Sequence, residues 1–163
     1  MKHSICCLAI TGWLTFLPLA AWPGDTTVLE ADTMVGVQGP FVGPANPVRE
    51  VPGGGLPWVL SEAKVELERD GALEVEVEGL VIPLSSVNPV PFFRAIVSCL
   101  TIDQASNVAI VNVITGNGAE VMIGDSFNGD AKIEEDLDLP TPCIAPIVFV
   151  TSSDGAWFAA TGF

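Results

Sequence analysis

Carboxylates are the side chains with which this chain could do chemistry. Its 163 residues include twenty acidic residues, no tyrosine and a single histidine, His3. His3 falls in a predicted export signal, so the mature chain lacks the base of a Ser/His/Asp triad, the activator of a cysteine thiolate and a common ligand of zinc. A pair of carboxylates could still hydrolyse a glycosidic bond. We therefore predict a non-catalytic protein and keep a carboxylate-dependent, glycosidase-like hydrolase as the alternative.

The acidic residues form two clusters. One is expected on a single solvated face of a hairpin, where a bound cation is the alternative: Glu66, Glu74, Glu76 and Glu78, with Glu68 at its margin. The other supplies candidate calcium ligands: Asp125, Asn128 and Asp130. It departs from the EF-hand pattern because the third and fifth positions from Asp125 are Phe127 and Gly129, which offer no side-chain oxygen. No cofactor is predicted, and a calcium-stabilised adhesion or assembly domain is a further alternative.

Two charged residues interrupt segments that are otherwise apolar. Glu135 shares a strand face with Ile133 and Leu137, and Arg94 lies in the apolar run that ends at Leu100. An inward carboxylate is costly unless it is paired. We therefore predict a buried Arg94–Glu135 ion pair, with a β-bulge that turns Glu135 outward as the rival interpretation.

Tryptophan is the side chain best suited to bind a ligand by stacking. Trp58 and Trp157 could stack on a sugar or on the apolar surface of a partner, or could both belong to the core. The predicted partner is accordingly an unidentified protein or carbohydrate. Only five basic residues follow Lys2, so an acidic surface excludes nucleic acid and anionic membranes as partners.

The N-terminus has the layout of an export signal. Lys2 precedes an apolar run, Ile5 to Leu19, and small residues follow at Ala20 and Ala21. The run is shorter than the roughly 20 residues that span a bilayer, which disfavours an uncleaved anchor. We predict cleavage after residue 21, no membrane association afterwards, and a secreted, extracellular or periplasmic location.

Four cysteines are present, and two of them would leave with the signal. In an oxidising compartment the remaining two, Cys99 and Cys143, are expected to form a disulfide. A reactive or metal-bound cysteine would need a histidine that the mature chain lacks.

The rest of the chain divides into an irregular segment and a body rich in strands. Residues 22–57 are dense in glycine and proline and are predicted to form either a flexible surface segment or an extended strap along the body. Residues 58–163 are predicted to form an antiparallel β-sandwich, immunoglobulin-like or jelly-roll-like, with a barrel as the alternative. The function predicted for this secreted domain is that of a binding or structural module.

The period-two pattern is clearest around Asp70 and Gly71. A loop of three residues, Arg69 to Gly71, sets Leu67 opposite Leu73 and Val65 opposite Val75, whereas a two-residue turn would mix the faces. Further strands are predicted over residues 92–102, 108–114, 120–123, 131–139, 145–151 and 156–161. The first, second and fifth of these are nearly all apolar, which predicts strands that are buried on both faces or lie in the core of a sandwich.

Overall fold

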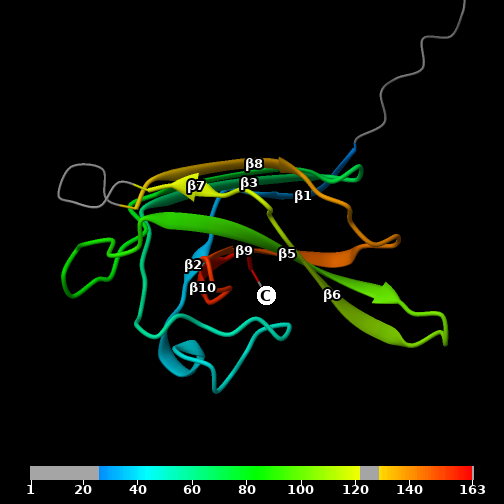
Figure 1. Ribbon diagram of the computed structural model, residues 1–163, viewed down its shortest axis with the longest axis horizontal. Helices are drawn as coiled ribbons and strands as arrows, with labels where there is room; N and C mark the ends of the chain where they lie inside the picture. Colours follow the sequence, from blue (N-terminus) through cyan, green and yellow to red (C-terminus); the bar gives the residue numbers. More distant parts are fainter. Residues whose placement is uncertain (1–25, 122–128, 163) are drawn as a thin grey trace, which may run out of the picture.

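Two antiparallel β-sheets pack face to face in the computed structural model, which describes residues 26–121 and 129–162 (Figure 1). The first sheet has the strand order β1-β3-β4-β8, and the second has the order β2-β10-β9-β5-β6 with the short β7 paired to the start of β5. The protein is therefore a β-sandwich with open sheets, as predicted. The strands of the first sheet are β1 (Thr27–Ala31), β3 (Glu62–Glu68), β4 (Ala72–Glu78) and β8 (Ala131–Asp136). Those of the second are β2 (Val35–Gly36), β5 (Phe92–Ile102), β6 (Val108–Ile114), β7 (Ala119–Glu120), β9 (Ile144–Thr151) and β10 (Trp157–Ala160).

The β3–β4 hairpin has the predicted register. Leu67 pairs with Leu73 and Val65 with Val75 across a three-residue loop. Gly71 closes this loop at a φ of 101°, and a Cβ there would lie 1.8 Å from the carbonyl oxygen of Leu137. Only glycine fits both conditions, so the loop fixes which face of the hairpin is buried.

Residues 37–57 of the glycine- and proline-rich segment form a strap across the second sheet, whereas earlier residues of the segment form β1 in the first sheet and β2 in the second. The strap includes a 3-10 turn at Gly39–Phe41 and runs on the side of the second sheet away from the first (cyan in Figure 1). Val37 and Val51 are buried, and the Phe41 ring lies 6.5 Å from that of Trp157. A Cβ on Gly53 would lie 1.9 Å from the carbonyl oxygen of Phe41. The glycines therefore allow the strap to pack closely, and of the two predicted alternatives the strap is the one observed.

One strand differs from its prediction. β6 was expected to be buried on both faces or to lie in the sandwich core, but it forms the edge of the second sheet, and its residues alternate between exposed and half-buried. β5 and β9 lie inside the sheet, where apolar side chains on both faces are covered by the first sheet and by the strap. An apolar run alone does not distinguish these two environments, because the partners on each side decide burial.

Candidate functional site

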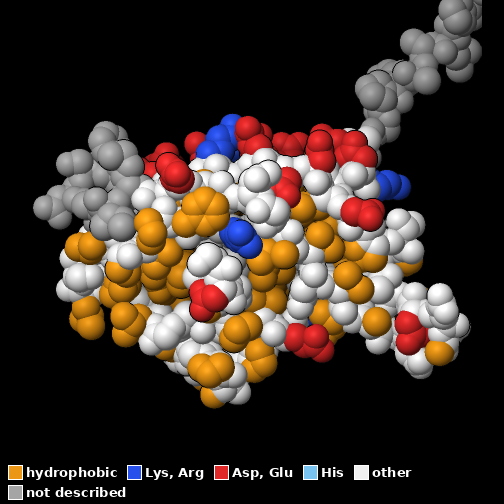
Figure 2. Space-filling view, viewed as in Figure 1, with side chains coloured by type: hydrophobic (Ala, Val, Ile, Leu, Met, Phe, Trp, Pro, Cys, Tyr) orange, Lys and Arg blue, Asp and Glu red, His pale blue; other side chains and the backbone are white. Residues whose placement is uncertain are grey.

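The outer face of the first sheet carries a row of carboxylates. The registers place Glu30 opposite Glu66, Glu66 opposite Glu74, and Glu74 opposite Glu134, one residue from each of the four strands. Figure 2 shows acidic side chains gathered along the upper edge of the molecule, where β1, β3 and β8 lie. Like charges directly opposite each other are unfavourable in a sheet. The predicted shared face is thus present, and it needs a source of positive charge.

Lys132 supplies that charge. Its Nζ lies 3.2 Å from Oε1 of Glu74 and 2.7 Å from Oε1 of Glu134. These side-chain hydrogen bonds raise the pKa of Lys132 above its usual range, and the bond to Glu134 contributes most. The row is therefore offset by a residue of the same sheet.

The predicted calcium ligands are not brought together by the described part of the chain. Asp125 and Asn128 lie outside the described residues. Asp130 instead accepts a hydrogen bond of 2.7 Å from the backbone N–H of Gly79, which ties the start of β8 to the end of β4. Within residues 26–121 and 129–162, no three histidine, cysteine or acidic side chains are grouped so that they could hold a metal ion.

A hollow of about 390 Å³ on the acidic face is one place where a carboxylate-dependent hydrolase could work. Its lining has no aromatic side chain, and it includes five outward carboxylates beside Ala72, Leu73 and the inward-facing Glu135: Glu66, Glu68, Glu74, Glu134 and Asp136. The hollow supplies acids but not the flat apolar platform on which a sugar ring stacks.

The predicted ion pair between Arg94 and Glu135 does not form, and this prediction is wrong. Both salt bridges between described residues belong to Lys132. Arg94 pairs with Thr151 on the outer face of the second sheet, and its guanidinium lies 5.9 Å from the centre of the Phe92 ring. Glu135 is half-buried and faces inward from the first sheet, in register with Leu73. The two side chains therefore lie on different sides of the second sheet.

Glu135 binds backbone amides instead of a cation. Its Oε1 accepts a hydrogen bond of 2.7 Å from the N–H of Gly116, and its Oε2 accepts one of 2.9 Å from the N–H of Asn117. Both amides follow β6, so one carboxylate from the first sheet holds the chain where it leaves the second. The inward orientation was predicted correctly, although the partner was not.

Replacing Glu135 with glutamine is expected to destabilise the fold by about 1–2 kcal/mol, because the charged carboxylate that accepts hydrogen bonds from two backbone amides is lost. Urea unfolding followed by circular dichroism measures this difference. Glu134→Gln removes the same charge from the neighbouring exposed position and should cost less than about 0.5 kcal/mol. Equal effects of the two substitutions would contradict the role assigned to Glu135.

Of the two alternatives for the tryptophans, ligand stacking and burial in the core, the structure shows burial in the core. Trp58 is 3% exposed and Trp157 is 1% exposed. The ring of Trp58 stacks on Phe158 at a centroid distance of 4.1 Å and meets the edge of Phe93 at 6.3 Å. The two tryptophans pack on opposite faces of the second sheet, and both belong to the core.

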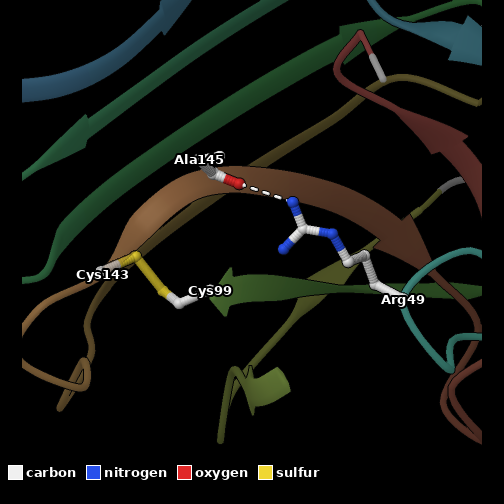
Figure 3. Close-up of a disulfide and its surroundings, with 4 residues drawn as sticks. All are labelled: Arg49, Cys99, Cys143 and Ala145. Carbon is white, nitrogen blue, oxygen red and sulfur yellow. Dashed lines mark hydrogen bonds between the residues drawn. A yellow bond between two sulfur atoms is a disulfide. The ribbon is translucent and has the colours of Figure 1, made fainter. Parts of the chain in front are cut away.

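The predicted disulfide joins Cys99 of β5 to Cys143, with a Cα–Cα distance of 4.9 Å (Figure 3). It lies beside a bulge, since Ser98 pairs with Ile147 but Leu100 pairs with Ile144. The strap reaches the same place, where Nη2 of Arg49 donates a hydrogen bond of 3.1 Å to the carbonyl oxygen of Ala145 (Figure 3). Disulfide, bulge and strap together fix the start of β9 against β5.

An exposed aliphatic patch lies next to this bulge, and the sequence analysis did not identify it. Paired residues of an antiparallel sheet share a face, and the β5–β6 and β5–β9 registers place the patch on the outer face of the second sheet. Asn112 lies on this same face between Ile110 and Ile114, and its Nδ2 donates a hydrogen bond of 2.9 Å to the carbonyl oxygen of Arg49 in the strap. We define the aliphatic patch as Ile102, Val108, Ile110, Ile114 and Ile144, which are between 36% and 68% exposed.

Comparison with protein-family models, with curated proteins and with solved structures found no match. Among the described residues, no helix is long and apolar enough to cross a membrane. The disulfide is compatible with an extracellular or periplasmic protein.

Proposed function

We propose that this chain is an exported, non-catalytic β-sandwich domain that acts as a binding module through the aliphatic patch. The export signal read from residues 1–21 and the disulfide support an oxidising location. The single observation that carries the binding role is the patch. Five of the nine large apolar side chains that are exposed in the described residues lie on this one face.

The patch is assigned a binding role because exposing apolar surface to water costs free energy. Aliphatic side chains scattered singly over a protein are ordinary, but a contiguous group marks a surface that another molecule covers. The patch contains no charged residue, in a chain whose formal net charge is −14. A protein surface of aliphatic character fits it better than a carbohydrate, because Trp58 and Trp157 lie in the core and cannot stack on a sugar.

The test compares two substitutions of the same kind. Immobilised wild-type protein, Ile144→Asp and Leu84→Asp are each incubated with the extracellular proteins of the source cells, and the retained proteins are quantified by mass spectrometry. Leu84 is 95% exposed and lies outside the patch, so it controls for the added charge. The wild type and Leu84→Asp should retain the same stoichiometric protein partner, and Ile144→Asp should lose it.

Two outcomes would contradict the proposal. Equal retention by all three proteins, or no stoichiometric partner for any of them, would remove the binding role of the patch. Hydrolysis of a glycoside by the wild type that Glu74→Gln abolishes would instead favour the hydrolase alternative.

A further inference from the structure

At the open edge of β6, the outward backbone groups have no strand partner among the described residues. Thr115 donates its N–H to the carbonyl oxygen of Ala95 at 3.0 Å, and Asp103 donates its N–H to the carbonyl oxygen of Asn107 at 2.9 Å. These contacts fix the phase of the β5–β6 ladder, because hydrogen-bonded and non-hydrogen-bonded pairs alternate in an antiparallel sheet. The odd-numbered residues of β6 therefore direct their backbone groups to β5. The even-numbered residues direct theirs to the open edge: Val108, Ile110, Asn112 and Ile114.

Nothing in β6 blocks the addition of another strand. Natural sheets protect their edges with charged residues, proline or bulges. The strand Val108–Ile114 contains no charged residue and no proline, and its pairing with β5 runs without a register shift. Among the described residues, β5 is its only strand partner. In Figure 1 the end of the β5–β6 hairpin projects beyond the other strands of the second sheet.

We propose that β6 pairs antiparallel with β6 of a second copy of this chain, about a two-fold axis at Val111. This inference rests on the proposed function, because strand pairing at this edge would join the aliphatic patches of two copies into one continuous face. The sequence of β6 is suited to antiparallel pairing with itself, because residues at equal distances on either side of Val111 are similar in size and none of them is charged. Val108 would face the partner's Ile114, Ile110 the partner's Asn112, and Ala109 the partner's Val113.

The distribution of charge favours contact between two copies at the β6 edge and disfavours contact through the outer face of the first sheet. The sequence has a formal net charge of −14, and the outer face of the first sheet carries the row of glutamates described above. Two copies that met through that face would set carboxylates against carboxylates. Contact through β6 joins two uncharged strands and leaves the acidic outer faces of both first sheets out of the interface. The aliphatic patches of the two copies then lie side by side on one face of the joined sheet, and the interface is isologous.

The test is the oligomeric state of the whole mature chain with its disulfide intact. Sedimentation equilibrium between about 1 µM and about 1 mM should show a reversible monomer–dimer equilibrium. Ile110→Glu places a charge in the shared strand pair and should weaken dimerisation at least about tenfold. Leu84→Glu adds the same charge at an exposed position outside the patch and should leave dimerisation unchanged.

Amide hydrogen exchange on the wild type tests the strand pairing without a substitution. At concentrations that favour the dimer, the outward amides of Ile110 and Asn112 should exchange at least about tenfold more slowly than in the monomer. A protein that stays monomeric throughout, a dimer that Ile110→Glu does not weaken, or a dimer whose outward amides exchange as in the monomer would each overturn the inference. If the protein is monomeric but retains a different stoichiometric partner that Ile144→Asp loses, this inference fails and the proposed function stands.

Discussion

Replacing both Cys99 and Cys143 with alanine is expected to lower the free energy of unfolding by about 4 kcal/mol. The disulfide joins residues separated by 44 positions, so it removes a large loop-closure entropy from the unfolded chain. It also secures the start of β9 at a bulge, where regular pairing with β5 is interrupted. Urea unfolding of the oxidised wild type and the double variant, followed by circular dichroism, measures the difference.

A reduced sample of the wild type is the matched control. It breaks the cross-link but keeps both sulfur atoms, so it separates the effect of the disulfide from the volume that alanine leaves around the buried Cys99. Reduced wild type and the double variant should both unfold at a much lower urea concentration than the oxidised protein. If reduction moves the midpoint by less than the error of the measurement, the disulfide is not what stabilises this part of the sandwich.

The parts of the fold that were predictable from the sequence are those decided by local pairing. The alternation on either side of Arg69 and Gly71 admits one register that buries both apolar faces, and the structure has that register. The disulfide was predictable because only two cysteines follow the predicted export signal. In both cases few arrangements were open to the chain.

The parts that were not predictable depend on which strands become neighbours over long sequence distances. β6 and β9 are both apolar runs, yet one lies at an edge and the other between β5 and β10. Arg94 and Glu135 are both charges within apolar patterns, but sheet order places them on different sides of the second sheet. Strand order depends on all the strands of a sheet, so it cannot be predicted from the sequence of any one segment.

In the candidate site, too, features set by local pairing were predictable and features set by long-range strand order were not. The alternation in the sequence was enough to place the glutamates on one face. The aliphatic patch requires three strands, β5, β6 and β9, in a particular order and register, with a bulge that brings Ile144 beside Leu100. That combination appears only once the sheet is assembled, which is why the surface that carries the proposed function was the one that the sequence did not reveal.

Replacing Trp58 with alanine is expected to destabilise the protein by about 3–5 kcal/mol, the usual cost of removing a buried aromatic side chain. The ring fills the space between Phe93 and Phe158, and its backbone N–H donates a hydrogen bond of 2.9 Å to the carbonyl oxygen of Val37. Trp58 thus joins the end of the strap to the second sheet. Urea unfolding of the variant measures the loss.

Trp58→Phe is the control that separates packing from recognition. Phenylalanine keeps an aromatic ring against Phe158 and should recover more than half of the stability lost in the alanine variant. A tryptophan that served to stack on a ligand would behave differently, because its removal would abolish binding and leave the unfolding free energy nearly unchanged. A small loss of stability in Trp58→Ala would therefore contradict the buried position of this side chain, and it would reopen carbohydrate as the partner in place of an aliphatic protein surface.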